Sequence, residues 1–129
     1  MPERILIVED NEHSRTFLGL ILGSAGYEVL EAENGTQAIE KALTGSPDLI
    51  LMDLGLPDMT GIDAARLIKA NPTTSHIPIM AYSAWSAREW REEALGAGMV
   101  EYLQKPVETE LIKAKIEKFL LRVSKTHLP

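Results

Sequence analysis

The chain has 129 residues, of which 45% are hydrophobic and 25% are charged, and this is the composition of one ordinary globular domain. The absence of cysteine excludes disulfides, thiolate zinc sites and thiol catalysis, and no apolar run approaches the ~20 residues needed to cross a bilayer. The net charge of -6 argues against a general nucleic-acid-binding surface, and the N-terminus lacks a signal peptide's apolar region, so we expect a cytoplasmic protein without direct nucleic-acid or membrane contacts.

Five apolar runs rich in Ile, Leu and Val predict five β-strands. They lie near residues 5 to 8, 28 to 32, 49 to 53, 77 to 82 and 101 to 104. A helical stretch follows each run. The second helix is expected over roughly Thr36 to Leu43, the third over about Gly61 to Ala70 and the fourth near Ala87 to Leu95. Gly26 marks the end of the first helix.

Three of these helices carry apolar residues at helical spacing, which we expect to face the core. The predicted core residues are Phe17, Leu18, Ile21, Leu22 and Ala25 in the first helix, Ala87, Trp90, Ala94 and Leu95 in the fourth, and Ile112, Ile116, Phe119 and Leu120 in the fifth.

Strands separated by single helices form right-handed crossovers into a parallel sheet, so we expect a three-layer α/β/α sandwich. No internal repeat, low-complexity segment or linker divides the sequence. We therefore expect a single domain over residues 1–129, with a core of about 4–123 and a short C-terminal tail, 124–129.

Polar residues follow four of the predicted strands. Glu9 and Asp10 follow the first, Asp53 ends the third, Ser83 follows the fourth, and Lys105 follows the fifth. In an open parallel sheet, ligands bind beyond the carboxyl ends of the strands, where the strand order reverses. The sequence thus predicts one site with three carboxylates, a hydroxyl and an amine.

Carboxylates converging to ~4 Å repel one another by roughly 1 to 4 kcal/mol per pair at effective dielectrics of 80 to 20. A bound divalent cation removes that cost. Oxygen donors without His or Cys favour Mg²⁺, with Mn²⁺ as the alternative, and the backbone carbonyl of Gly55 is a plausible further ligand beside Glu9, Asp10 and Asp53.

With a metal bound, one oxygen of Asp53 can act as a nucleophile towards phosphorus, which would give an aspartyl phosphate. The Lys105 ammonium and the Ser83 hydroxyl suit two phosphoryl oxygens, and no general base is needed. Each residue alone has an ordinary explanation, such as a helix cap or a solvated lysine. Their joint occurrence in this order points to a phosphoryl site.

Two other classes of protein share part of this residue pattern. A haloacid-dehalogenase-type phosphatase normally has a second Asp two positions after its nucleophile, where this chain has Gly55. A dinucleotide-binding module requires a Gly-rich turn after the first strand, but Glu9-Asp10-Asn11-Glu12 occupies that turn and would repel a pyrophosphate.

The ordered set of motifs resembles the receiver domains of two-component response regulators over essentially the whole chain. The matching motifs are Val8-Glu9-Asp10-Asn11, Leu49-Ile50-Leu51-Met52-Asp53 with Leu56-Pro57 and Gly61, Pro78 through Ser83-Ala84, and Lys105-Pro106. The resemblance implies a flavodoxin-like (βα)5 fold with a five-stranded parallel sheet in the order 2-1-3-4-5.

The resemblance also implies a phosphorelay function. Asp53 would accept a phosphoryl group from a phosphohistidine on a sensor histidine kinase or a histidine phosphotransfer protein, with Mg²⁺ at the Glu9-Asp10 pair and with Ser83 and Lys105 binding the phosphoryl group. Such a domain is not an enzyme in the usual sense, because it catalyses only its own phosphoryl transfer and dephosphorylation.

In the family, the residues matching Ser83 and Tyr102 form a switch pair, in which the hydroxyl moves to the phosphoryl group and the ring turns inward. The bond matching Lys105-Pro106 is commonly cis. Trp85 lies two residues beyond Ser83 and has two interpretations. It is either a partly buried aromatic at the helix entrance or a shield that slows attack by water on the phosphoryl group.

A downstream protein target would bind the face of the fourth helix, fifth strand and fifth helix. This face carries Lys113, Lys115, Lys118 and Arg122, which form either a solvated basic surface or a docking surface for an acidic partner. Leu20 lies off the core stripe of the first helix, where it is either an isolated exposed leucine or part of a kinase-facing patch.

We expect a stand-alone domain that is a monomer or a weak dimer. Two alternatives stay open. The chain could be a receiver segment of a larger hybrid histidine kinase, or a protein-binding module that works without phosphorylation.

Overall fold

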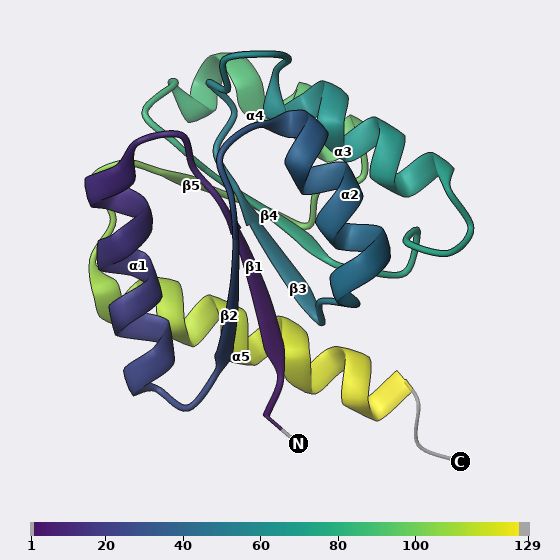
Figure 1. Ribbon diagram of the computed structural model, residues 1–129. Coiled ribbons are helices and arrows are strands. Elements are labelled where there is room, and N and C mark those ends of the chain that lie inside the picture. The colour runs from purple at the N-terminus through teal and green to yellow at the C-terminus, as the bar shows by residue number, and fades with distance from the viewer. Residues whose placement is uncertain (1, 127–129) are drawn as a thin grey trace.

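The computed structural model describes residues 2–126, with side chains up to residue 121, and has strands and helices in strict alternation (Figure 1). The strands are β1 (Arg4–Val8), β2 (Glu28–Ala32), β3 (Leu49–Met52), β4 (Ile79–Ser83) and β5 (Glu101–Gln104). The helices are α1 (Glu12–Ser24), α2 (Gly35–Gly45), α3 (Gly61–Ala70), α4 (Ala87–Gly96) and α5 (Thr109–Thr126).

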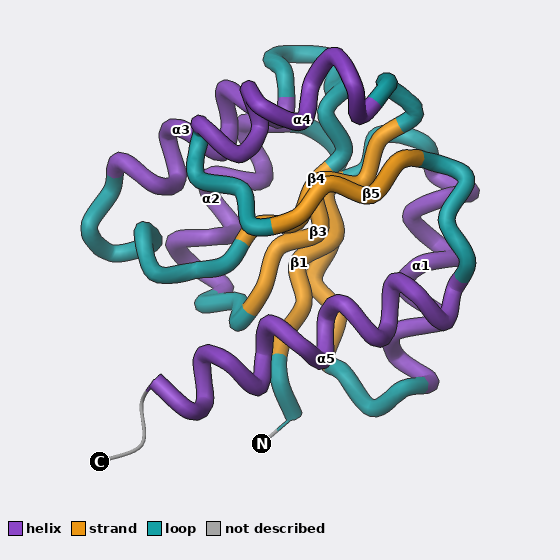
Figure 2. Tube along the Cα trace, turned by 180° about the vertical axis from the view of Figure 1, so that it is seen from behind, coloured by secondary structure: helices purple, strands orange, loops and turns teal. Residues whose placement is uncertain are grey.

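The strands form one five-stranded sheet in the order β2-β1-β3-β4-β5, and all neighbouring pairs are parallel. The helices α1 and α5 cover one face, whereas α2, α3 and α4 cover the other (Figures 1 and 2). This confirms the predicted three-layer sandwich and its strand order. The order reverses between β1 and β3, so the site predicted at the carboxyl ends lies at this position.

The sheet separates two apolar clusters. On β1, Leu6 and Val8 pack towards α2 and α3, and Ile5 and Ile7 pack towards α1 and α5. Successive side chains of a strand point to opposite faces, so a strand covered on both sides is apolar throughout. This explains the uninterrupted apolar runs of β1 and β3, which are central strands.

Helix ends follow local signals in the sequence. The side chain of Asn11 accepts a hydrogen bond from the Ser14 N–H and caps α1, and Gly26 ends the following turn with a φ of 98°. β4 begins at Ile79 rather than at residue 77. Pro78 has no N–H, and the Ile77 N–H donates to the Thr74 carbonyl, so neither can join the ladder as a donor.

Three predicted core residues, Phe17, Ala25 and Leu95, are exposed, which corrects the expected helix faces. Phe17 is 58% exposed and Leu95 is 41% exposed, although each follows or precedes a buried neighbour, Leu18 and Ala94. Consecutive residues on a helix are about 100° apart, so a narrow buried stripe leaves the adjacent position in solvent. The predicted residues of α5, from Ile112 to Leu120, are buried as expected.

The C-terminal helix is longer than the expected core. α5 continues to Thr126, beyond residue 123, because no glycine or proline interrupts the sequence before Pro129. Residues 127–129 of the predicted tail lie outside the described part of the chain. Within residues 2–126, no helix has the length and apolar character of a membrane span.

The loop between β3 and α3 folds back closely onto Asp53. The N–H of Gly61 donates to the Leu54 carbonyl at 2.8 Å, and a Cβ added to Gly61 would lie 2.2 Å from the carbonyl oxygen of Asp53. Backbone atoms, unlike a flexible side chain, cannot move aside cheaply. Gly61 is therefore required by close approach of two backbone segments.

We predict that Gly61→Ala lowers the free energy of unfolding by about 1 to 3 kcal/mol, the usual cost of overpacking. Urea denaturation measures this change. Gly23→Ala is the matched control, because a Cβ there meets nothing within 4 Å and lies in a helix. The control should be neutral or slightly stabilising, and equal effects of the two substitutions would contradict the explanation.

Candidate functional site

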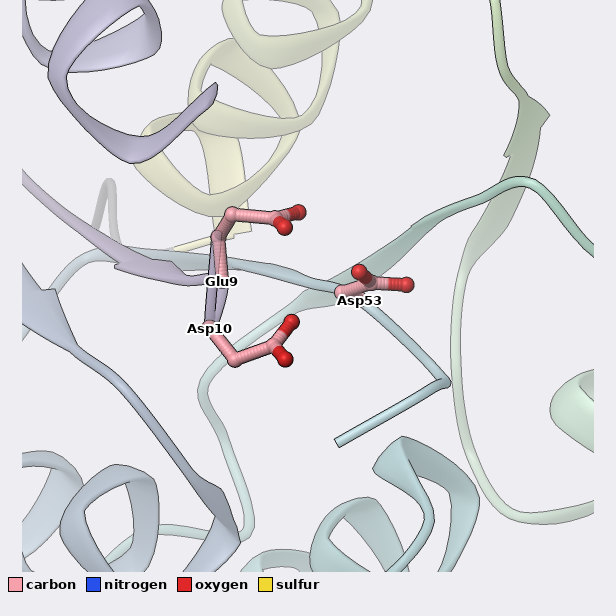
Figure 3. Close-up of side chains that lie close together, drawn as sticks. All are labelled: Glu9, Asp10 and Asp53. Carbon is pink, nitrogen blue, oxygen red and sulfur yellow. The ribbon is translucent and has the colours of Figure 1, made fainter. Parts of the chain in front are cut away.

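Three carboxylates meet at the carboxyl edge of the sheet (Figure 3). Glu9 and Asp10 follow β1, Asp53 follows the adjacent strand β3, and each offers one oxygen within 4.8 Å of the others. Glu9 and Asp53 are buried, whereas Asp10 is exposed. Three carboxylate oxygens, with one residue open to solvent, fit a hydrated hard cation such as Mg²⁺ and do not fit zinc.

Lys105 forms ion pairs with both buried carboxylates. Its Nζ lies 2.8 Å from Oε2 of Glu9 and 3.3 Å from Oδ2 of Asp53. Burial raises the pKa of Glu9, the hydrogen bond from Lys105 opposes this shift, and the charge of Asp53 adds to it. Burial lowers the pKa of Lys105, but the bond to Glu9 and the two negative charges outweigh it and leave the pKa raised.

Ser83 is buried at the end of β4, and its Oγ accepts a hydrogen bond from the Trp85 N–H at 3.1 Å. The backbone carbonyl of Ser83 accepts from the Lys105 N–H at 2.7 Å, which fixes the main chain of Lys105 beside β4. The Lys105-Pro106 peptide bond is cis. The structure thus brings the predicted hydroxyl and amine to the same sheet edge as the carboxylates.

Tyr102 already lies inward. Its side chain is 4% exposed, and its hydroxyl donates to the carbonyl oxygen of Trp85 at 2.8 Å. Ser83 and Tyr102 are therefore joined through the two backbone groups of Trp85, its N–H and its carbonyl. The sequence predicted the two residues of the pair but gave no sign of this connection.

The Trp85 side chain lies over Gly55. A Cβ added to Gly55 would be 3.5 Å from the indole Nε1, so the ring occupies space that a larger residue at 55 would need. The ring is half-buried and its centroid is 4.7 Å from that of Trp90. The Gly55 N–H donates to Oδ1 of Asp53 at 3.3 Å. Trp85 is thus a packed aromatic that also covers the segment next to Asp53.

Arg15 is a site residue that the sequence analysis missed. Its Nη1 donates to the backbone carbonyl of Glu9 at 2.9 Å, and its guanidinium forms ion pairs with Glu31 and Glu33, each at 3.3 Å. The contact ties the Glu9-Asp10 turn to α1 and to the end of β2. A helical arginine six residues after Glu9 was the available signal, but its direction depends on tertiary structure.

Asp58 was also missed, and it holds the β3-α3 loop against α2. Its carboxylate accepts hydrogen bonds from the N–H groups of Gly35 and Thr36 at 2.8 and 2.9 Å, and from the Thr36 hydroxyl at 2.7 Å. A carboxylate at a helix N-terminus satisfies free N–H groups and is favoured by the helix dipole. The loop that follows Asp53 is thereby anchored.

The predicted basic surface of α5 is partly neutralised. Lys113 pairs with Glu110 at 2.8 Å and Lys115 pairs with Glu101 at 3.1 Å, while the Lys118 ammonium lies 5.4 Å from the Phe119 ring centroid. The Arg122 side chain lies outside the described residues. On α1, Leu20 is exposed, as its position off the core stripe predicted.

Comparison with known proteins identifies relatives over nearly the whole chain. Residues 5–117 match the family model described as "Response regulator receiver domain". The polar-differentiation response regulator DivK of Brucella anthropi is 32% identical over 120 residues, an alignment that covers 93% of this chain and 98% of DivK.

Solved structures agree with this match. A CheY-like receiver domain protein from Methanospirillum hungatei has a TM-score of 0.90 at 28% identity and covers 98% of this chain and 99% of its own. The receiver domain of the sensor histidine kinase PA1611 from Pseudomonas aeruginosa has a TM-score of 0.86 at 35% identity, with 93% and 98% covered. The latter is described with a magnesium ion coordinated in its active-site cleft.

The anchoring by Asp58 predicts a measurable titration. The Thr36 hydroxyl bond, with the Gly35 and Thr36 N–H bonds, holds the pKa of Asp58 at about 2 instead of 3.8. Because the folded pKa is the lower one, this contribution to stability is complete above the unfolded pKa and is lost as the pH falls through about 2. Thr36→Val should raise the pKa of Asp58, measured by carbon NMR of the carboxyl group.

Thr44→Val is the control, because its hydroxyl donates to the Glu40 carbonyl within the same helix, away from Asp58. The pKa of Asp58 should not change in this variant. An unchanged pKa in Thr36→Val as well would mean that the hydroxyl does not stabilise the carboxylate.

Proposed function

The chain belongs to the family of response regulator receiver domains of two-component signalling, and from this membership we propose that Asp53 is its phosphoacceptor. The phosphodonor would be a phosphohistidine on a sensor histidine kinase or a histidine phosphotransfer protein. One observation carries the proposal. Three carboxylates converge at the carboxyl edge of the sheet, and Lys105 contacts the two buried ones, Glu9 and Asp53.

The donor set suits a divalent cation. Glu9, Asp10, Asp53 and the Gly55 carbonyl would hold Mg²⁺, with Mn²⁺ as the alternative. When bound, the ion would neutralise the carboxylates and the phosphoryl oxygens. Arg15 supports this role through its bond to the Glu9 carbonyl, which fixes the turn that presents the first two ligands.

In the transfer, an oxygen of Asp53 forms the new bond to phosphorus as the bond from phosphorus to the histidine nitrogen breaks, and the electron pair stays on the imidazole. The Lys105 ammonium, 3.3 Å from Asp53, is placed to neutralise the incoming oxygens. The Ser83 hydroxyl would donate to another phosphoryl oxygen. The domain would catalyse this transfer and its own dephosphorylation only.

We propose that the signal passes through Trp85. A hydroxyl of Ser83 that turns towards Asp53 gives up its bond from the Trp85 N–H, and the carbonyl of the same residue holds Tyr102. Because the Tyr102 ring is already buried, phosphorylation would change the position of the Trp85 carbonyl that accepts from its hydroxyl, rather than the orientation of the ring. The face of α4, β5 and α5 next to Tyr102 would then bind a downstream protein.

We propose a single domain over residues 1–129 that acts in the cytoplasm as a monomer or weak dimer. A receiver segment within a larger hybrid kinase is the second candidate, and it is favoured by the 35% identity to the receiver domain of the PA1611 histidine kinase.

The proposal is tested by intact mass after incubation with a small-molecule phosphodonor, with and without Mg²⁺. We expect a Mg²⁺-dependent, hydroxylamine-labile phosphoryl adduct in the wild type and none in Asp53→Asn. Asp63→Asn is the control, since Asp63 is an exposed residue in the first turn of α3 and pairs with Arg66. It should be phosphorylated like the wild type.

The absence of an adduct under all conditions would overturn the phosphoacceptor role and favour a phosphorylation-independent binding module. An adduct that persists in Asp53→Asn would place the acceptor elsewhere.

Trp85→Ala should shorten the lifetime of the phosphorylated protein about two- to tenfold, because removal of the indole opens the space over Gly55 to water. Loss of the adduct over time, followed by mass, measures the lifetime. Trp90→Ala is the control, since it removes the neighbouring ring but leaves the indole over Gly55. A wild-type lifetime in Trp85→Ala, or equal shortening in both variants, would show that Trp85 does not act as a shield.

A further inference from the structure

Tyr82 lies directly before Ser83 in β4 and contacts the proposed phosphoryl-binding lysine. The Lys105 Nζ lies over the Tyr82 ring, 4.8 Å from its centroid. The ring packs at the edge of the apolar cluster under α1 and α5. Its hydroxyl has no hydrogen-bond partner among the described residues, so the contact with Lys105 uses the ring.

The ammonium of Lys105 has three donors, and two carboxylates engage it, Glu9 at 2.8 Å and Asp53 at 3.3 Å. Its side chain is only 21% exposed, so water solvates it poorly. An aromatic face attracts a cation within about 6 Å of its centroid, whereas an aliphatic side chain of similar size does not. The ring is therefore a third contact of the ammonium, in addition to the two carboxylates.

We propose that Tyr82 is a positioning residue for Lys105 and that its ring keeps the ammonium beside Asp53 when the carboxylates take other partners. This inference rests on the proposed phosphoacceptor function. In the present arrangement the two carboxylates and the ring hold the ammonium together. Once Glu9 and Asp53 bind a cation or a phosphoryl group, they hold Lys105 less, but the attraction of the ring is unchanged.

Backbone contacts hold Lys105 close to Tyr82. The Lys105 N–H donates to the Ser83 carbonyl, and Tyr82 pairs with Leu103 in the sheet register. The main chain of Lys105 is thus fixed next to the residue after Tyr82, and its side chain returns over the ring. A tyrosine at this strand position therefore contacts the lysine from the strand next to β5.

The test compares Tyr82→Phe, which keeps the ring, with Tyr82→Leu and Tyr82→Met, which fill similar space without one. Two aliphatic variants are used so that a folding defect in one does not decide the result. The rate of phosphorylation by a small-molecule donor at saturating Mg²⁺ should be like the wild type for Phe and about two- to tenfold lower for Leu and Met.

The same substitutions in a Lys105→Met background separate positioning from folding. If Tyr82 acts through the ammonium, its replacement by Leu or Met should have no further effect there. An equal loss in both backgrounds, or a wild-type rate in the Leu and Met variants, would overturn the inference.

A second readout requires no phosphorylation. Protons above an aromatic face are shifted upfield in NMR, so the side-chain methylene protons of Lys105 should show this shift in the wild type and in Tyr82→Phe, and lose it in Tyr82→Leu. Absence of the shift in the wild type overturns the inference. If the shift is present but Asp53 takes no phosphoryl group, the contact stands and the proposed function fails.

Discussion

The contact of one ammonium with two buried carboxylates organises this site. Glu9 and Asp53 follow adjacent parallel strands, so the sheet itself places two like charges side by side. Lys105, from the end of β5, lies against both and offsets the repulsion that burial would otherwise make costly. One ammonium against three carboxylates leaves a net negative charge, which a divalent cation would offset in the proposed function.

The surrounding loops are held by backbone contacts that keep these charges in place. Gly61 allows the chain after Asp53 to pass against the Asp53 carbonyl, and Asp58 fixes the same loop to the start of α2. Arg15 holds the Glu9 carbonyl from α1. The three contacts come from three different elements, so each of the two strand ends is tied to a neighbouring helix or loop.

The sequence predicted the features that depend on the order of residues along the chain, which are the strands and the polar residues that follow them. Central strands are apolar throughout, and the polar residues that follow them must meet at one sheet edge, so the carboxylates, Ser83 and Lys105 were found. It did not predict how narrow the buried stripe of each helix is, so Phe17, Ala25 and Leu95 were placed in the core and are exposed. The contacts of Asp58 with Gly35 join residues 23 positions apart and follow only from tertiary structure.

Trp85 connects the acidic site with Tyr102 through its backbone. The Trp85 N–H donates to the Ser83 hydroxyl oxygen, and the Trp85 carbonyl accepts from the Tyr102 hydroxyl, so both hydrogen bonds involve the same short backbone segment. Each of these two hydrogen bonds contributes on the order of 1 kcal/mol net to stability. The charge-assisted bonds that a phosphoryl group would form with Ser83 and Lys105 are stronger. In the proposed switch, a phosphoryl group on Asp53 would outweigh the bond from the Trp85 N–H to Ser83 and change the hydrogen bonding around Tyr102 without a large movement of its ring.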